Sequence, residues 1–301
     1  PDLAQHLQIT YDDLKLHNDS LIMLSISPYG LTGPYSTYKG HEINSAALSG
    51  VTLQLGLPDR PPLNPPLFLG HSQVGLVGAM SAMIALTARD MTGVGQHIDV
   101  SEADCWATYH NGIGLSQWLF SSRVTMRQGR HGRGGPYPNT ILPCKDGEIR
   151  MQLFSAREWQ RLLDVMGNPE WGNDPRFQDR LEMNRLYSDE VDAHISDWFK
   201  DYTKAELFDK FYEYKVPFTP VNTVTDFFHH PQMTARNFFV DVTHPEAGTT
   251  RQPGPPYKLS ETPISIRRPA PLLGEHNDYI YGEILGMSGA EVATLRDRAI
   301  I

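Results

Sequence analysis

The chain has 301 residues, of which 40% are hydrophobic and 20% charged, and its formal net charge is -9. This composition is globular and excludes a largely disordered chain, and the length suits two domains better than one. Because no cluster of Lys and Arg interrupts the acidic balance, a nucleic-acid partner is not expected. Two cysteines cannot build a disulfide framework, which favours a reduced, cytoplasmic setting.

Residues 1–126 have the pattern of a parallel α/β unit. Strand and helix patterns alternate there: strand 21–27, helix 41–52, a Pro-rich stretch 57–66, helix 75–90, strand 96–100 and a helix from Ser101 to about residue 119. The longest apolar run, 74–86, is shorter than the roughly 20 residues of a membrane span, so no membrane partner is expected. The apolar run 21–27 predicts a buried strand with more neighbours than the chain supplies before it. We therefore expect an N-terminal segment to precede residue 1.

The second half of the chain predicts an α+β domain. Its expected elements are a hairpin at 140–153, helices at 155–167, 186–200 and 203–215, a short strand at 217–222 and a last helix after Gly274. The predicted organisation is a large domain over 1–126, a Gly-rich linker over 127–138, a small domain over 139–238, and a return linker over 239–301. The last helix of that return linker is expected to pack on the large domain.

Few residues in this sequence point to chemistry. Motifs of phosphate-binding loops, nucleophile elbows and zinc proteases are missing, and we expect no metal site. His41 and His71 each follow a glycine and open a predicted helix. A helix N-terminus disfavours the imidazolium, so either histidine could act as a neutral base, or it could simply hydrogen-bond its own helix end. Cys105 lies on an apolar helix and is expected to be buried rather than reactive.

Several blocks of the sequence resemble the class III coenzyme A transferases. That family includes the carnitine-CoA and formyl-CoA transferases and the α-methylacyl-CoA racemases. The blocks are SPYGLTGPYSTYKGHEINSAALSG, GLVGAMSAMIALTARDMTGVGQHIDVSEAD, YPNTILPCKDGEIRMQL, TPVNTVTDFFHHPQ and APLLGEHNDYIYGEILG, in family order. The resemblance implies an α/β fold with a Rossmann-like large domain and a smaller α+β domain. It also implies a homodimer of interlocked chains, and about one hundred further residues at the N-terminus.

The resemblance also implies site residues. Lys39 and His41 match positions beside the thioester, and the racemases carry a His in a G-H-D-I-N motif very like GHEIN at 40–44. The segment Gly132, Arg133, Gly134 and Gly135 matches the glycine loop that folds over the acyl group. Local sequence alone favours a hinge between domains over a flap above a ligand.

Residue 71 departs from the family pattern. Transferases have an Asp after the glycine that corresponds to Gly70, and this Asp attacks the thioester to form an aspartyl-CoA intermediate. Here the residue is His71, and the nearest acids along the chain are Asp59 and Asp90. An imidazole can attack a thioester but cannot form the mixed anhydride of the carboxylate route.

Three functions therefore stay open. The resemblance implies an enzyme that transfers CoA between an acyl-CoA thioester and a carboxylic acid, with coenzyme A thioester as substrate and no permanently bound cofactor. A racemase or epimerase of 2-methylacyl-CoA would instead use His41 and His71 as opposed acid and base. A catalytically silent paralogue would only bind an acyl-CoA.

Overall fold

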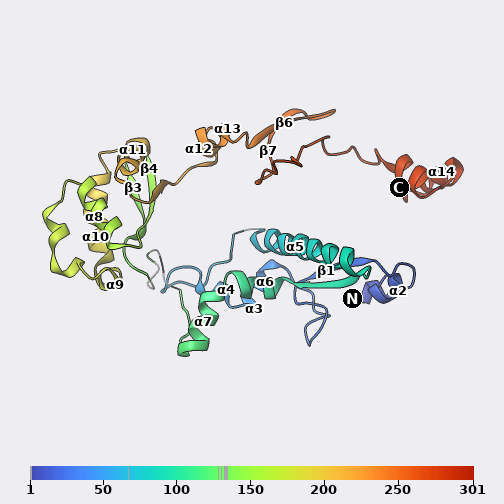
Figure 1. Ribbon diagram of the computed structural model, residues 1–301, viewed down its shortest axis with the longest axis horizontal. Helices are drawn as coiled ribbons and strands as arrows, with labels where there is room; N and C mark the ends of the chain where they lie inside the picture. Colours follow the sequence, from blue (N-terminus) through green and yellow to red (C-terminus); the bar gives the residue numbers. More distant parts are fainter. Residues whose placement is uncertain (1, 67, 128, 130, 132–134) are drawn as a thin grey trace. The chain divides into compact units, whose positions relative to one another are not determined.

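The computed structural model of the chain describes residues 2–66, 68–127, 129, 131 and 135–301. It divides into two compact units, residues 1–221 and 222–301 (Figure 1). The elements of the first unit are α1 Asp2–His6, α2 Tyr11–Lys15, β1 Ile22–Ser27, α3 Glu42–Leu48, α4 Val51–Gln54, α5 Leu69–Thr92, β2 Gln96–Ser101, α6 Glu102–Tyr109, α7 Gly112–Ser121, β3 Asn139–Cys144, β4 Gly147–Gln152, α8 Ala156–Val165, η1 Glu170–Asn173, η2 Pro175–Phe177, α9 Arg180–Glu182, η3 Met183–Tyr187, α10 Ser188–Phe199, α11 Lys204–Tyr214 and β5 Phe218–Pro220. The second unit contains α12 Val224–Phe228, α13 Pro231–Ala235, β6 Phe239–His244, β7 Gly248–Pro253, η4 Asp278–Ile284 and α14 Gly289–Asp297. The domain boundaries proposed from composition stay predictions.

A βαβ arrangement forms the centre of residues 1–126. Strands β1 and β2 pair in parallel, and α5 connects them and packs on both. Gly78 lies at this contact, where an added Cβ would come within 3.1 Å of methyl carbons of Leu24 and Ile26. The glycine therefore lets the helix axis lie close to the sheet. A small core of Val74, Val100 and Cys105 fills the space between helix and strands.

Strand β1 is less buried than its apolar sequence predicts. Its side chains alternate between half-buried and exposed, and Ile26 is 47% exposed. Within the described residues, β1 has one neighbouring strand and is covered by α5 on one face. A strand with this composition is typical of a sheet that is covered on both faces.

Two helices that the sequence predicts as continuous are each broken in the structure. The segment 41–52 forms α3 and α4, which meet at Gly50 in a left-handed conformation with φ +82°. The segment 101–119 forms α6 and α7, which meet at Asn111. The Asn111 side chain links the two breaks. It donates to the carbonyl of Ser49 at 2.6 Å and accepts a hydrogen bond from the side chain of Gln54. An added Cβ at Gly50 would lie 2.9 Å from the Asn111 amide nitrogen.

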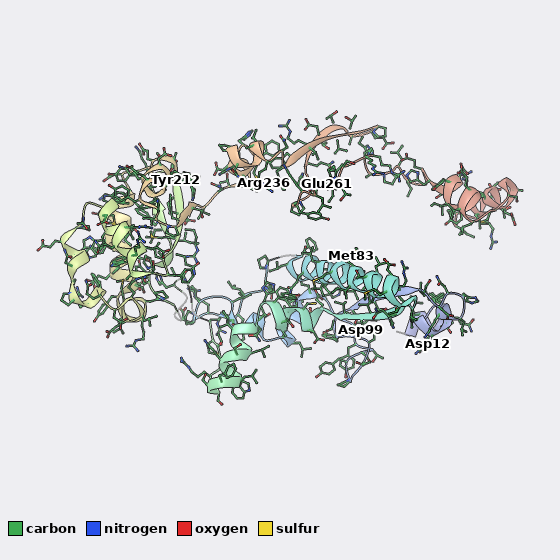
Figure 2. All side chains as sticks on the ribbon, in the orientation of Figure 1. Asp12, Met83, Asp99, Tyr212, Arg236 and Glu261 are labelled. Carbon is green, nitrogen blue, oxygen red and sulfur yellow. The ribbon has the colours of Figure 1, made fainter. Side chains whose placement is uncertain are left out.

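Helix α5 is longer than the predicted 75–90. Its 24 residues include an 18-residue window of mean hydropathy 1.3, which would suffice, by length and composition alone, for a membrane span and corrects the length argument made from residues 74–86. Core helices of soluble proteins pass the same test, and α5 has buried residues against β1, β2 and α6. A row of its apolar side chains is nevertheless exposed, among them Met83, labelled in Figure 2.

Residues 139–221 form an α+β layer with the largest core of the chain. The predicted hairpin is confirmed as β3 and β4, and β5 adds a third antiparallel strand. The core between this sheet and helices α8, α10 and α11 holds Leu142, Ile149, Met151, Leu162, Ile195, Phe199, Leu207 and Phe211, among others. The three helices match the predicted segments, because each has a regular apolar face.

The second unit contains a hairpin that the sequence interpretation missed. Strands β6 and β7 pair antiparallel from Phe239 with Pro253 to His244 with Gly248. Residues 239–301 were expected to form a linker and a helix. Every residue of β7 is exposed, so this strand lacks the apolar alternation by which a half-buried strand is found.

A glycine at the entry to β2 provides a test of the β1–β2 packing. Gly95 donates its amide to Asp19, and an added Cβ would lie 1.9 Å from the carbonyl oxygen of Leu21. We expect Gly95→Ala to lower the free energy of unfolding by about 2 kcal/mol or more, because backbone must move to admit the methyl group. The control is Gly75→Ala, an exposed helix position with open space, which should raise stability by about 0.5–1 kcal/mol. Equal melting curves for the two variants would contradict this packing.

Candidate active site

The start of α3 places His41 at the surface. His41 is the N-cap residue of α3, and its backbone amide donates to the side chain of Asn44 at 3.0 Å. Gly40 lies directly against the Tyr29 ring, since an added Cβ would come 2.7 Å from the phenol oxygen. This close approach fixes the backbone between Lys39 and His41. The side chains of both residues are exposed.

Glu42, the first residue of α3, holds the start of α5. Its carboxylate accepts hydrogen bonds from the backbone amides of Phe68, at 3.0 Å, and Gly70. The first amides of a helix have no partner within the helix and carry partial positive charge, so a carboxylate is well suited to bind them. Phe68 has φ +62°, a left-handed conformation that is strained for a side chain of this size.

His71 lies in the first turn of α5 between two carboxylates. Its Nδ1 is 3.3 Å from Oε2 of Glu42 and 3.4 Å from Oε1 of Glu102. The side chain of Glu42 is 14% exposed and that of Glu102 7%, whereas the His71 side chain is 57% exposed. The ring therefore directs Nδ1 toward the protein and leaves its Nε2 side open.

Buried polar atoms surround this contact. Oε1 of Glu102 and Nε1 of Trp106 are buried and have no hydrogen-bond partner among the described residues. Both lie beside Gly70, where an added Cβ would come 2.7 Å from each of them. Gly70 is therefore required so that α6 can bring Glu102 and Trp106 against the first turn of α5.

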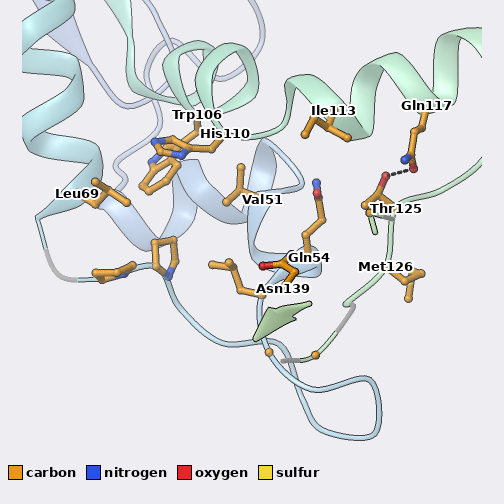
Figure 3. Close-up of a pocket in the computed structure, with 16 residues that line it drawn as sticks. Val51, Gln54, Leu69, Trp106, His110, Ile113, Gln117, Thr125, Met126 and Asn139 are labelled. Carbon is orange, nitrogen blue, oxygen red and sulfur yellow. Dashed lines mark hydrogen bonds between the residues drawn. The ribbon is translucent and has the colours of Figure 1, made fainter. Parts of the chain in front are cut away.

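A cavity of about 590 Å³ shares Trp106 with this region (Figure 3). Its wall combines apolar side chains with a few polar groups, which is typical of sites for small molecules. It is lined by Val51, Gln54, Leu55, Leu69, Trp106, His110, Ile113, Gln117, Thr125, Met126, Gly135 and Asn139, among others. Neither His41 nor His71 is part of this lining, although Leu69 and Trp106 connect the cavity wall to the neighbours of His71.

The structure partly groups the residues predicted from sequence. The residue after His41 contacts His71, so the starts of α3 and α5 lie together, as their motifs suggested. Gly135 lines the cavity. Gly132, Arg133 and Gly134 lie outside the described residues. That both imidazoles and Lys39 act on one substrate stays a prediction.

Sequence reasoning missed the two glutamates. It searched for acids close to residue 71 in the chain and found Asp59 and Asp90, whereas Glu42 and Glu102 come from two other helices. A signal for Glu102 was available, because it shares one face of α6 with the buried Cys105 and Trp106. A charged residue on an otherwise apolar helix face indicates a specific buried partner.

Cys105, a buried thiol beside this site, matches its expected structural role. Burial raises the pKa of the Cys105 thiol, and the negative charges of Asp104 and Glu102 raise it further. The thiol therefore stays protonated near neutral pH and is not a nucleophile.

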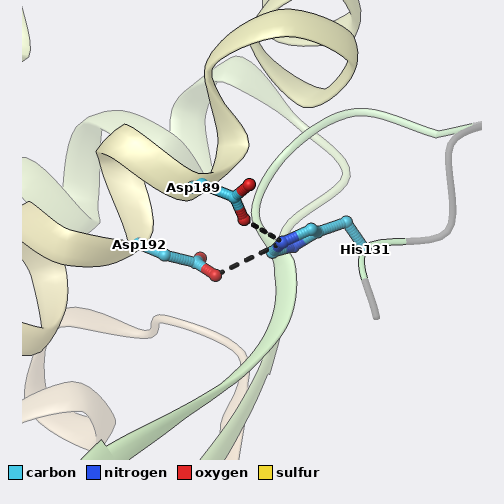
Figure 4. A group of neighbouring side chains, drawn as sticks. All are labelled: His131, Asp189 and Asp192. Carbon is cyan, nitrogen blue, oxygen red and sulfur yellow. Dashed lines mark hydrogen bonds and ion pairs between the residues drawn. The ribbon is translucent and has the colours of Figure 1, made fainter. Parts of the chain in front are cut away.

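A second cluster of titratable groups lies in the α+β layer (Figure 4). Nε2 of His131 is 3.2 Å from Asp189 and 3.4 Å from Asp192, both on α10, and the three offer their atoms at distances compatible with a metal ion. Asp192 also accepts hydrogen bonds from the hydroxyl groups of Tyr137 and Thr140. The buried Asp192 carboxylate therefore already has hydrogen-bond partners. The cluster is explained as a contact between His131 and α10.

Comparison with known proteins assigns the chain to a family. The model of CoA-transferase family III matches residues 1–277. The beta subunit of succinyl-CoA–L-malate CoA-transferase from Chloroflexus aurantiacus is 30% identical over 309 residues, covering 100% of this chain and 75% of that relative. A formyl-CoA:oxalate CoA-transferase from Rhodopseudomonas palustris is 27% identical, covering 99% of this chain and 74% of the relative.

Solved structures agree with this assignment. A CaiB/BaiF family protein from Brucella suis superposes with a TM-score of 0.82 and 25% identity, covering 94% of this chain and 73% of that one. A Mycobacterium tuberculosis protein gives a TM-score of 0.78 at 22% identity, covering 93% of this chain and 74% of its own, and shares the mixed α/β fold. The chain belongs to CoA-transferase family III, and the relatives it resembles are named as CoA-transferases.

Proposed function

We propose that this protein transfers CoA from a short acyl-CoA to a small dicarboxylic or hydroxycarboxylic acid, with His71 at the reacting centre. The observation that carries the proposal is the open imidazole of His71, held at the start of α5 by two carboxylates. Similar proteins are named for succinyl-CoA with malate or citramalate, and for formyl-CoA with oxalate. All of these substrates are short carboxylic acids or their thioesters, and coenzyme A thioester is the only cofactor-like group required.

Neither glutamate at the site is placed to act as the nucleophile. The carboxylate oxygens of Glu42 are occupied by the amides of Phe68 and Gly70, and Glu102 is buried behind His71. The reaction therefore proceeds by direct transfer. The carboxylate of the acceptor acid attacks the carbonyl carbon of the donor thioester. The C–S bond of the thioester breaks, and a mixed anhydride and CoA thiolate form. The thiolate then attacks the acceptor carbonyl, which yields the new acyl-CoA and releases the donor acid.

His71 serves this reaction as a donor rather than as a nucleophile. In its imidazolium form, Nε2–H can bind the acceptor carboxylate and its charge can stabilise the departing thiolate, while Glu42 and Glu102 balance that charge. The exposed Lys39 is assigned to binding the substrate. Gly132, Arg133, Gly134 and Gly135 are assigned to binding of the acyl group, and the described member of this set, Gly135, lines the cavity.

We propose further that the functional unit is a cytoplasmic homodimer whose large domain is Rossmann-like and whose chains interlock. None of the ten residues of α7 is buried, although the helix is strongly apolar. Its exposed side chains include Ile113, Trp118, Leu119 and Phe120, and those of α5 include Leu76, Met80, Met83 and Ile84. Apolar surface of this extent indicates contact with another protein surface.

Substitution at residue 71 can test whether this residue faces the thioester and whether the wild-type enzyme uses a nucleophile of its own. His71→Asp alone would place a third carboxylate beside Glu42 and Glu102, so it is combined with Glu102→Leu to remove the repulsion from one of the two. With acyl-CoA, we expect this double variant to form an enzyme–CoA thioester on the peptide that contains residue 71, detected by mass spectrometry and lost with hydroxylamine. The matched control, His71→Asn with Glu102→Leu, should form none. Wild-type protein should transfer one ¹⁸O from labelled acceptor acid to the released donor acid without any enzyme thioester.

Two outcomes of that experiment would overturn the assignment. A thioester on Glu42 or Glu102 of the wild-type protein would replace direct transfer by an enzyme-carboxylate route. Absence of the thioester in the double variant that carries His71→Asp, in protein that still binds acyl-CoA, would show that residue 71 does not face the thioester.

The racemase alternative makes a different prediction for His41. With a 2-methylacyl-CoA in D₂O, we expect CoA transfer to an added acid without deuterium uptake at the α-carbon. Uptake that falls about 10²-fold or more in His41→Ala would establish the racemase function instead, because that is the typical loss when a positioned base is removed. If the protein binds acyl-CoA but shows neither CoA transfer nor deuterium uptake, the silent paralogue is favoured.

The dimer can be tested at α7. Light scattering of the complete protein at micromolar concentration should give the mass of a dimer, and an interface of this kind buries about 2,000 Å² or more. Phe120→Asp should shift the equilibrium toward monomer, since it places a charge on the exposed apolar face. Tyr212→Asp, at a similarly exposed aromatic residue of α11, is the control and should leave the mass unchanged. A monomeric wild-type protein would refute the proposal.

A further inference from the structure

Glu102 is an unusual residue for its place in the fold. It is the first residue of α6, directly after the capping Ser101, and its side chain is buried with Ala103, Cys105 and Trp106 rather than directed to solvent. A carboxylate removed from water is strongly unfavourable unless a charged or hydrogen-bonding partner compensates it.

Within the described part of the chain, the ion-pair contact of Glu102 is with His71, whose ring carries a charge only when it is protonated. Oε1 of Glu102 accepts no hydrogen bond there, and Nδ1 of His71 lies 3.4 Å away. The missing Cβ of Gly70 provides the space for this approach. The buried carboxylate therefore depends on His71, whose Nδ1 is shared between Glu102 and the slightly nearer Oε2 of Glu42, at 3.3 Å.

The two glutamates differ in what else they bind. The Glu42 carboxylate already accepts the amides of Phe68 and Gly70, so it anchors the backbone of α5 with or without a histidine at residue 71. Glu102 accepts no such backbone amides among the described residues. Removing Glu102 should therefore change the orientation of the His71 ring while the start of α5 stays in place.

We propose that Glu102 is a positioning residue whose buried carboxylate, 3.4 Å from Nδ1 of His71, attracts the Nδ1–H group and thereby holds Nε2 toward the substrate. The proposal deepens the function assigned above and rests on it for its catalytic consequence. An acidic residue behind a histidine fixes its tautomer and orientation, and ring misplacement of about 1 Å can cost about 10²-fold in rate. Glu102 itself touches no reacting atom and undergoes no covalent change.

The test compares Glu102→Leu with Glu102→Gln in the complete protein. Leu keeps the volume but accepts no hydrogen bond, whereas the Gln oxygen can still accept Nδ1–H. We expect Glu102→Leu to lower kcat about 10- to 100-fold with little change in KM for acyl-CoA, and Glu102→Gln to restore most of that loss. Asp104→Asn, an exposed acid two residues along α6, is the control for charge and should behave as wild type.

A spectroscopic readout separates positioning from a merely structural role. In ¹⁵N-histidine spectra, with His71 assigned by comparison with His71→Asn, the neutral ring should carry its proton on Nδ1 in the wild type and in Glu102→Gln. In Glu102→Leu, the Nε2–H tautomer should gain population. An unchanged His71 spectrum in folded Glu102→Leu, or a loss of kcat that Glu102→Gln does not restore, would overturn the proposal. If the spectra change as expected but wild type transfers no CoA, the proposed function fails while the Glu102–His71 pair stands.

Discussion

The hydrogen bonds between the Glu42 carboxylate and the first amides of α5 set the geometry on which the site depends. They link the start of α3 to the start of a 24-residue helix, and that helix connects the two parallel strands. A helix start offers amides and partial positive charge, so the carboxylate both caps α5 and fixes its direction. The strained conformation of Phe68 is maintained at this junction, and His71 follows it within the first turn.

Close backbone contacts at glycines assemble the rest of the site. Gly40 admits the Tyr29 ring, Gly50 admits the Asn111 amide, and Gly70 admits Glu102 and Trp106, each at a distance that a Cβ would block. Because these contacts join segments that are far apart in sequence, the site is a product of tertiary packing. The lining of the cavity beside Trp106 includes Val51 and His110, which lie next to the two helix breaks that Asn111 connects.

Local patterns predicted the elements whose apolar periodicity is regular. Strand 21–27 follows from a short apolar run, the 140–153 hairpin from two strand patterns around a turn, and the three helices of the α+β layer from a helical apolar face; the resemblance identified residue 71 as the point of departure. The breaks at Gly50 and Asn111 did not follow, because an isolated glycine or asparagine is tolerated within a helical pattern. The approach of Glu42 and Glu102 to His71 could not follow either, since it depends on how α3 and α6 pack on α5.

The pairing of Glu102 with His71 bears on whether the site is active. A carboxylate at residue 71 would face two further carboxylates at close range, one of them buried, so this packing is suited to a histidine and unfavourable for an acid. If residue 71 had no function, the fold would gain nothing by burying Glu102, because replacing a buried ion pair with apolar side chains is often neutral or stabilising. The pair is therefore more readily explained by a role for the oriented imidazole than by stability. In the proposed reaction, an oriented imidazolium at residue 71 would suit the replacement of one carboxylate by another on the thioester. The acceptor acid would then supply the attacking carboxylate that residue 71 does not.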